Sequence, residues 1–249
     1  MFGLFSKKTS TENALFFHTD IHCHIVPGID DGSPSLERSI ELVRRMRGWG
    51  LKRIIATPHV TEDTFENTAE TITPPFNTLK NALAEQSIDC TLEHSAEYRI
   101  DDFFIQQVNG HFLMPYPDNY LLVENSFVQE PWNLDQTLFD LMLKGWHPVL
   151  AHPERYHYYF DKKERYLRLH QNGTLFQINL LSLAGYYGKE EKRTAEWLIE
   201  NRLVDLIGTD LHRSAHADCI DKYLTSKDYA RHRKQLEGMV KNDLLFPAR

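Results

Sequence analysis

The chain has 249 residues, of which 41% are apolar, and its formal net charge is −7. This size and composition suit one domain with a sizeable core, and the acidic balance without a basic run argues against a protein that grips a nucleic-acid backbone. No apolar run approaches the roughly 18 residues of a membrane-spanning helix, so stable membrane insertion is not expected. Three cysteines, an odd number without recognisable spacing, fit a reducing cytoplasm.

The beginning of the chain differs from the rest. Residues 1–8 are too few for a secretory signal, and their two lysines follow the apolar residues instead of preceding them. We therefore expect residues 1–15 to form a flexible tail and residues 16–249 to form a single domain.

Strand-like and helical segments then alternate along the chain. Apolar, β-rich runs predict seven strands, at residues 16–25, 52–57, 90–96, 120–123, 148–151, 175–179 and 203–208. Apolar residues at spacings of three and four predict helices at residues 35–49, 76–86, 133–144, 162–172 and 190–200. This alternation favours parallel strands joined by right-handed crossovers, and seven strands suggest a closed or nearly closed TIM-like α/β barrel.

Residues that bind metals stand at the ends of these strands. His22 and His24 flank one residue, so both side chains project to the same face of an extended backbone. Further candidates follow in chain order: His59, Glu97, Glu124, His152, Asp210 and His212. The C-terminal strand ends of a parallel barrel meet at one face, and a carboxylate that ends an apolar run is costly to bury unless it is paired or bound to a cation. The pattern predicts a multinuclear metal site.

These motifs resemble those of a known superfamily. The ordered set His22-x-His24, Asp31, His59, Glu97, Glu124, His152 and Asp210-x-His212 is similar to that of the polymerase and histidinol phosphatase (PHP) superfamily. Within it, the phrases Asp20-Ile-His-Cys-His-Ile-Val-Pro-Gly-Ile-Asp-Asp-Gly, Thr57-Pro-His and Ala151-His-Pro-Glu-Arg-Tyr resemble the metal-dependent protein-tyrosine phosphatases of bacterial capsular and exopolysaccharide gene clusters, the CpsB/CapC/YwqE-like family. The resemblance extends from about Thr19 to the C-terminus.

The resemblance implies a distorted seven-stranded (β/α)7 barrel, the PHP fold, with three divalent ions. Mn²⁺ is expected first, with Fe²⁺ or Zn²⁺ as alternatives. Carried over by position, the ligands would be His22, His24, Glu97 and Asp210 for the first ion, Glu97, Glu124 and His152 for the second, and Asp31, His59 and His212 for the third. Asp30 is the alternative to Asp31. Four ligand carboxylates carry about −4, so three divalent ions leave about +2, which attracts a phosphate dianion.

Arg155 is the leading candidate for a group that contacts substrate without binding metal. It lies three residues after His152, and a planar guanidinium can hold phosphate oxygens in bidentate fashion. A surface ion pair is the alternative interpretation. We expect Arg155 and Asp210 to serve catalysis, and Arg155 together with Arg213 to bind substrate. Cys23 is interpreted as core packing, because no phosphate-cradling loop with an arginine follows it.

The expected function is metal-dependent hydrolysis of phosphotyrosine in protein, on the tail of a bacterial tyrosine kinase that regulates capsular or exopolysaccharide synthesis and export. A small-molecule phosphatase of the histidinol-phosphate type is the first alternative, a nuclease the second and a binding module without catalysis the third. The acidic charge argues against a nuclease and a nucleic-acid partner. The expected location is the cytoplasm, and the oligomeric state stays open, with a homo-oligomer as one option.

Overall fold

Parallel strands form the centre of the fold in the computed structural model, which describes residues 14–248. Nine strands lie in that range: β1 (Thr19–Asp20), β2 (Arg53–Ala56), β3 (His59–Val60), β4 (Thr91–His94), β5 (Glu97–Arg99), β6 (Tyr120–Glu124), β7 (His147–Ala151), β8 (Leu175–Asn179) and β9 (Leu206–Gly208). They pair in two sheets of order β1-β2-β4 and β3-β5-β6-β7-β8-β9, and every pairing is parallel. The chain therefore has a mixed α/β fold, in which the larger sheet curls as half a barrel.

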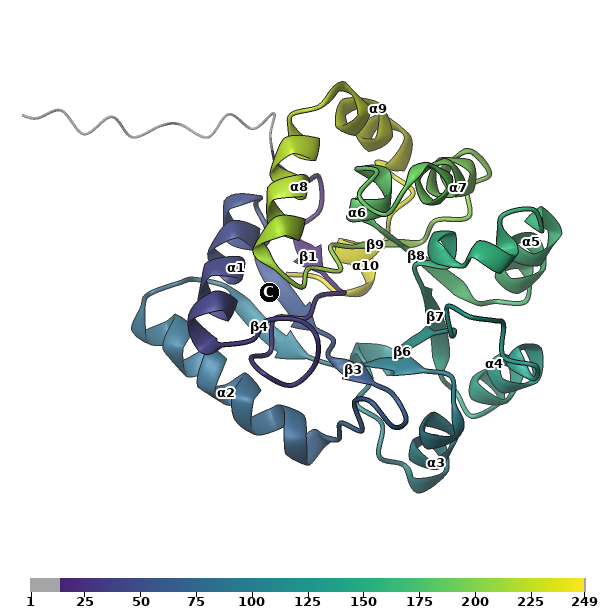
Figure 1. The fold of residues 1–249 in the computed structure, drawn as a ribbon, viewed down its shortest axis with the longest axis horizontal. Coiled ribbons are helices and arrows are strands. Elements are labelled where there is room, and N and C mark those ends of the chain that lie inside the picture. Colours follow the sequence, from purple (N-terminus) through teal and green to yellow (C-terminus); the bar gives the residue numbers. More distant parts are fainter. Residues whose placement is uncertain (1–13, 249) are drawn as a thin grey trace, which may run out of the picture.

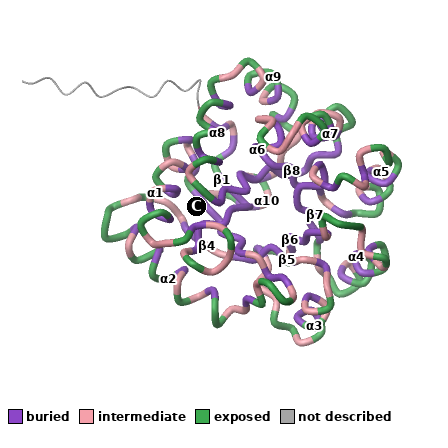
Figure 2. Tube along the Cα trace, in the orientation of Figure 1, coloured by how far each residue is buried: buried purple, intermediate pink, exposed green. Residues whose placement is uncertain are grey.

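Helices cover the outside of the strands (Figure 1). The described residues contain α1 (Leu36–Gly48), α2 (Ala69–Glu85), α3 (Asp102–Gly110), α4 (Leu134–Leu143), α5 (Lys163–Gln171), α6 (Leu180–Leu183), α7 (Lys189–Glu200), α8 (Ser214–Leu224), α9 (Lys227–Leu236) and α10 (Asn242–Leu245), with short 3₁₀ turns at Pro117–Asn119, Pro153–Arg155 and His157–Tyr159. Figure 2 shows buried strands in the interior and exposed outer faces on the helices. None of the helices in residues 14–248 combines the length and the hydropathy needed to cross a bilayer.

Nine strands are observed where seven were predicted, because β3 and β5 lie just beyond the predicted strands at residues 52–57 and 90–96, which contain β2 and β4. β2 and β3 are separated by Thr57 and Pro58, and β4 and β5 by a similar two-residue segment that starts at Ser95. Proline has no N–H to donate to a neighbouring strand, which explains the first interruption. Hydrogen bonds nevertheless continue across both interruptions: Thr57 N donates to Cys23 O at 2.8 Å, and Ser95 N donates to Ala56 O at 2.8 Å.

The end of the first strand segment contacts the end of the last one. Cys23 and Leu211 form an isolated parallel bridge. Beside it, Asp210 N donates to His22 O at 2.8 Å, and His24 N donates to Leu211 O at 3.0 Å. The first and last motifs of the sequence are therefore joined directly through their backbones.

One predicted helix starts earlier than its periodicity indicated. α2 begins at Ala69, although the periodicity predicted a start at residue 76, and it contains Pro74 and Pro75. Thr71 Oγ1 accepts a hydrogen bond from Thr68 N at 2.9 Å and so satisfies a donor at the helix start. The added turns extend the helix that packs against α1.

The tail predicted for residues 1–15 falls largely on residues 1–13, which lie outside the described part. Its last two positions are described and contact the domain. Leu15 is buried and its N–H donates to Trp49 O at 2.9 Å, and Ala14 O accepts from Tyr229 Oη at 2.6 Å.

A small buried cluster supports the strand ends that carry the candidate ligands. It contains Ile21, Ile55, Tyr116, Leu122, Val149, Ala151, Leu206 and Phe246. Leu122 precedes Glu124 in β6 by two positions, so the two side chains project from the same face of the strand. The apolar packing of Leu122 thereby fixes the position of a carboxylate at the strand end.

Candidate metal centre

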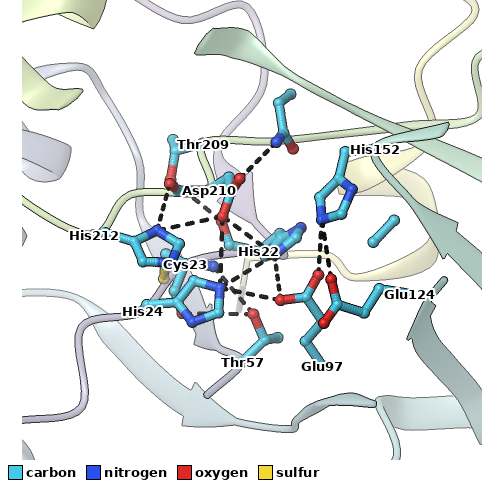
Figure 3. A network of polar contacts seen from close by, with 12 residues as sticks. His22, Cys23, His24, Thr57, Glu97, Glu124, His152, Thr209, Asp210 and His212 are labelled. Atoms are coloured by element: carbon cyan, nitrogen blue, oxygen red, sulfur yellow. Dashed lines mark hydrogen bonds and ion pairs between the residues drawn. The ribbon is translucent and has the colours of Figure 1, made fainter. Parts of the chain in front are cut away.

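The nine predicted ligands gather in one place, and Figure 3 labels all of them except Asp31 and His59. They fall into four overlapping groups, and within each group one candidate ligand atom per residue lies within 4.8 Å of the others. The groups are His24, Asp31, His59 and His212; His22, Glu97 and His152; His22, His24 and Asp210; and His59, Glu97 and Glu124. The shared members make this a single centre with room for more than one ion.

Glu97 lies in the middle of the centre. Its Oε2 is 3.2 Å from His22 Nε2, 3.3 Å from His24 Nε2 and 3.1 Å from His59 Nδ1, while its Oε1 is 3.0 Å from His152 Nε2. Glu97 begins β5 and pairs in register with His59 in β3, so the parallel pairing itself brings these two residues together. One carboxylate thus contacts members of all four groups.

Asp210 uses its two oxygens differently. Oδ1 faces the histidines, 3.5 Å from Nε2 of both His22 and His24 and 3.4 Å from His212 Nδ1. Oδ2 accepts hydrogen bonds from Arg155 at 3.0 Å, and further bonds come from the side chains of Asn179 and Tyr187.

Two of the candidate ligands have a strained backbone. Asp210 has a φ of 50° and His152 a φ of 34°, both in the left-handed region that residues other than glycine rarely adopt. Strain of this kind persists only where the surroundings enforce it, and it concentrates at functional sites.

The structure distinguishes the two aspartates that the sequence left as alternatives. Asp31 Oδ1 lies 3.5 Å from Nε2 of both His59 and His212 and belongs to their group. Asp30 instead contacts His24 Nδ1 at 2.8 Å and accepts from the backbone N–H of Gly32 at 3.0 Å. Asp30 therefore orients the ring of His24 through Nδ1, and Asp31 is the aspartate whose carboxylate lies among the candidate ligands.

Polar residues of β8 that the sequence analysis missed also orient ligands. Gln177 Oε1 lies 2.7 Å from His22 Nδ1, which leaves Nε2 of that histidine to face the centre. Gln177 Nε2 donates to Asn179 Oδ1 at 2.8 Å, and Asn179 Nδ2 donates to Asp210 Oδ2 at 2.6 Å. The signal was two polar side chains at alternate positions of an otherwise apolar strand.

Asp20 was also missed, although it precedes the His-x-His motif. Its carboxylate accepts hydrogen bonds from the backbone N–H and the hydroxyl of Thr209 and from His22 N. Burial raises the pKa of Asp20 to about 6, against the opposing effect of the Thr209 hydrogen bonds. Asp20 thus ties the first metal motif to the last.

The residues present fit bound cations. Among the buried side chains of the described residues, Glu97 Oε2 and both oxygens of Glu124 have no hydrogen-bond partner. Burial, and then repulsion by Glu97, raises the pKa of Glu124 to about 7. Burial lowers the pKa of His152 to about 4, so its imidazole is neutral, which is the form that binds metals. Divalent cations would offset the cost of these buried carboxylates.

Arg155 is held beside the centre by three contacts. Nη1 lies 3.0 Å from Asp210 Oδ2, and the guanidinium carbon lies 4.7 Å from the ring centre of Phe127 and 4.0 Å from that of Tyr187. The alternative interpretation, a surface ion pair with a neighbour, does not hold, because Arg155 pairs with a buried candidate ligand. Arg213 is exposed at the start of α8.

The centre opens into a cavity of about 240 Å³. Besides candidate ligands, its walls include the arginines Arg99, Arg155 and Arg213 and the aromatic residues Phe65, Phe127, Tyr186 and Tyr187. Arg99 was not singled out from the sequence, and its Nε lies 3.6 Å from Glu124 Oε1. The cavity thus combines a carboxylate–imidazole floor with cationic and aromatic walls.

The sequence matches one family model over most of its length. The family of capsular polysaccharide synthesis proteins CpsB/CapC matches residues 18–232. The chain belongs to this family. The match includes all nine candidate ligands and both arginines predicted to bind substrate.

Relatives within the CpsB/CapC family cover most of the chain. The tyrosine-protein phosphatase YwqE of Bacillus subtilis is 34% identical over 194 residues, 78% of this chain and 76% of that protein. The putative tyrosine-protein phosphatase CapC of Staphylococcus aureus is 28% identical over 228 residues, 91% of this chain and 89% of that protein. A crystal structure from the pair YwqE of B. subtilis and CpsB of Streptococcus pneumoniae, described as unique metal-dependent tyrosine phosphatases, matches with a TM-score of 0.77 at 30% identity and covers 93% of this chain and 95% of that one.

In this CpsB/CapC member, Cys23 has no access to the cavity. Its side chain is fully buried, and Sγ lies 3.9 Å from Ile55 O. Burial, together with Asp20 and other nearby carboxylates, raises the pKa of the Cys23 thiol well above its usual value. A neutral, inaccessible thiol cannot serve as the nucleophile of a phosphatase.

Proposed function

We propose that the chain is a metal-dependent protein-tyrosine phosphatase, a phosphoric monoester hydrolase that acts on phosphotyrosine in protein. The observation that carries this proposal is the buried carboxylate–imidazole centre with Arg155 stacked beside it and an aromatic-lined cavity above it. The names of the YwqE, CapC and CpsB relatives support the same reaction.

We further propose three divalent ions, with Mn²⁺ as the most suitable. The residues that would hold them are His22, His24, Glu97 and Asp210; Glu97, Glu124 and His152; and Asp31, His59 and His212. Mixed imidazole and carboxylate donors suit Mn²⁺, Fe²⁺ and Zn²⁺ alike, and metal supply selects among them. Bound ions would supply Lewis-acid activation of water and neutralise charge on the phosphoryl group.

The protein's own groups hold the substrate in place. Arg155 donates N–H groups to phosphoryl oxygens, and its ion pair with Asp210 and stacking on Tyr187 fix its direction beforehand. Arg213, exposed beside the cavity, assists as a second cation. The aromatic walls formed by Phe65 and Phe127 contact the phenyl ring of the substrate.

The chemistry of the leaving group favours an aryl ester over an aliphatic one. A tyrosine phenolate has a conjugate acid with a pKa of about 10 and leaves without a strong general acid. The histidines of the centre are all engaged with carboxylates, so none is free to protonate an aliphatic alkoxide. This argument ranks the small-molecule phosphatase of the histidinol-phosphate type second.

The remaining features of the proposal concern context and architecture. The substrate would be the tail of a bacterial tyrosine kinase that regulates capsular or exopolysaccharide synthesis and export, in the cytoplasm. Residues 16–249 would form one domain, a distorted seven-stranded barrel made of both sheets and completed by the bridge between Cys23 and Leu211.

The decisive experiment compares two substrates on the same protein. Phosphate release from a phosphotyrosyl peptide and from histidinol phosphate, at matched concentrations, is measured with metal-stripped protein before and after addition of Mn²⁺. Mn²⁺-dependent turnover that favours the peptide supports the proposal. Turnover of histidinol phosphate but not of the peptide would be compatible with the metal centre but would refute a protein substrate. Metal-dependent release of nucleotides from single-stranded DNA would indicate a nuclease.

A further inference from the structure

A second groove, of about 520 Å³, begins where the cavity of the metal centre ends. Three chain segments supply adjacent residues to both: Thr61 lines the cavity and Glu62 the groove, Arg99 the cavity and Ile100 the groove, and Phe127 the cavity and Val128 the groove. The groove therefore leads away from the cavity along a shared rim. A chain that inserts one side chain into the cavity must pass over this rim.

One lip of the groove is apolar and strongly exposed. Trp132 is 95% exposed and Val128 is 87% exposed, both on the segment between β6 and α4. Exposed tryptophan is uncommon on a surface without a partner, and tryptophan is enriched where proteins bind one another.

The apolar lip is held in a fixed position. Glu130, between Val128 and Trp132, receives two hydrogen bonds from Arg165, at 2.8 and 2.9 Å. Tyr158 Oη donates to Ser126 O at 2.9 Å. A segment tied at both positions presents its apolar side chains without first having to order itself, which lowers the entropic cost of binding.

The opposite lip is acidic. It includes Glu62, Asp101 and Asp102, and among residues 14–248 no lysine or arginine forms an ion pair with any of the three. Slight burial, and then repulsion by Asp101 and Asp102, raises the pKa of Glu62. Glu130 on the other lip is already neutralised by Arg165. Both carboxylate oxygens of Asp101 accept backbone hydrogen bonds, so the negative charge without a cationic partner among the described residues lies on Glu62 and Asp102. These two residues line the same groove as the exposed indole ring of Trp132, and this combination fits a basic side chain.

We propose that this groove binds the residues that flank phosphotyrosine in the substrate, and that it selects a lysine or arginine there. The basic side chain lies between Glu62, Asp102 and the ring of Trp132, while the phosphotyrosine enters the cavity. This inference rests on the proposed phosphatase function. It also explains how a protein of formal charge −7 attracts a phosphorylated segment, since the basic flank offsets the charge of the phosphate.

The test uses three phosphotyrosyl peptides that differ only in their flanking positions, which carry lysine, alanine or glutamate. The Mn²⁺-loaded full chain is assayed for kcat/KM on each peptide, with para-nitrophenyl phosphate as a reference too small to reach the groove. We expect the lysine peptide to exceed the alanine peptide by about fivefold at low salt, as one exposed ion pair allows, and the advantage to shrink as salt is added.

Variants of groove residues test whether a preference for the lysine peptide arises from the groove. The double variant Glu62→Gln/Asp102→Asn is expected to bring the lysine and alanine peptides to within about twofold of each other, because neither amide carries charge. Trp132→Ala is expected to lower the kcat/KM of the lysine peptide relative to para-nitrophenyl phosphate by about fivefold, the loss of one exposed cation–π contact. The matched controls, Glu85→Gln/Glu200→Gln and Leu244→Ala, remove exposed charge and exposed apolar surface elsewhere and should leave the peptide preferences as in the parent protein.

Three outcomes overturn the proposal without touching the phosphatase assignment. Equal kcat/KM for the three peptides is one, and a lysine preference that survives the double variant is the second. A change of oligomeric state in Trp132→Ala, measured by light scattering, would instead make the groove an interface between copies and likewise refute it. Failure of the proposed function gives a different result: no Mn²⁺-dependent turnover of any peptide or of para-nitrophenyl phosphate.

Discussion

Asp210 has one oxygen directed at the centre and the other anchored by three donors, so its charge serves both metal binding and the position of Arg155. Asp210→Asn preserves shape but removes that charge. We expect kcat on a phosphotyrosyl peptide to fall by about 100-fold or more and metal occupancy to drop, since the loss of groups that merely support ligands already costs about 10- to 100-fold. Elemental analysis of the purified variant, together with initial rates, checks this expectation.

His22→Ala provides the companion measurement, because His22 contacts Glu97 and Asp210 but not Arg155. Both variants should lose metal. If either keeps full metal content and the activity of the parent protein, the ligand assignment is wrong at that position.

Arg155 carries a separate prediction. Arg155→Lys retains the positive charge but loses the planar fork and the stacking between Phe127 and Tyr187. We expect kcat/KM to fall by about 10- to 100-fold, a loss of bidentate positioning, while metal content stays as in the parent protein. Arg213→Lys, at an exposed position, should have a smaller effect. Equal effects of the two variants would contradict the central role given to Arg155.

Sequence reasoning could name the ligands but not the groups that orient them. His22, Glu97 and Asp210 follow β-rich runs, so their positions at strand ends can be read from the order of residue types. The roles of Gln177 and Asp20 depend on which atoms they contact in the folded chain. Gln177 contacts Nδ1 of His22, and Asp20 accepts a hydrogen bond from the N–H of Thr209. No spacing along the chain encodes such a contact.

At the scale of elements, each of the seven predicted strand ranges overlaps an observed strand, because buried parallel strands are continuous apolar runs, but the first range, residues 16–25, holds only the two-residue β1. The additional strands β3 and β5 and the division of the strands between two sheets were not predictable, since both depend on which neighbouring strand each segment pairs with. Five helices were missed: α3, α6, α8, α9 and α10. Two of them begin with capping side chains, because Asp101 accepts from Phe104 N in α3 and Ser226 accepts from Tyr229 N in α9. In α9 the mean hydropathy is low, which hides the apolar stripe.

Asp205 joins three elements and supports a stability prediction. Its carboxylate contacts His170 Nε2 in α5 at 2.9 Å, accepts from Phe176 N in β8 at 3.1 Å and accepts from Lys241 Nζ, before α10, at 2.7 Å. An asparagine at position 205 carries no charge to pair with the Lys241 ammonium. We expect the free energy of unfolding at pH 7 to fall by about 2 kcal/mol, the size of a lost hydrogen bond to a charged group. Urea denaturation with equal m values checks this.

The same carboxylate predicts the pH dependence of that difference. Burial raises the pKa of Asp205, but the bonds from His170 and Lys241 outweigh burial and leave the pKa below its usual value. A carboxyl with a lowered pKa stabilises the fold above its unfolded pKa of about 3.9, and this contribution is lost as the pH falls through the folded pKa. The gap between the parent protein and Asp205→Asn should therefore be full at pH 7 and narrow below about pH 4. A gap that widens in acid would contradict this account.

For the molecule as a whole, removal of metal should lower thermal stability as well as activity. The centre buries several carboxylates, and neither oxygen of the Glu124 carboxylate receives a hydrogen bond. Bound cations would compensate these buried negative charges. With Mn²⁺ at about 100 times its dissociation constant, we expect about 3 kcal/mol of stabilisation relative to the metal-stripped protein. Calorimetric scans with chelator and with added Mn²⁺ measure this difference.

The control is the variant Asp210→Asn, which is expected to fold but to bind metal poorly. Asp210→Asn should unfold at a temperature that depends much less on Mn²⁺ than that of the parent protein. If neither chelator nor Mn²⁺ changed the unfolding temperature of the parent protein, the centre would hold no ion that stabilises the fold.

The backbone bridge between Cys23 and Leu211 also has a consequence for biosynthesis. Thr209 lies 189 residues after Asp20, so the ribosome makes the segment from Thr209 to His212 long after the first metal motif. A nascent chain that stops before residue 209 keeps Glu97 and Glu124 without the residues that complete the centre. We expect such a fragment to bind metal poorly, so the centre can form only after residue 212 has been made.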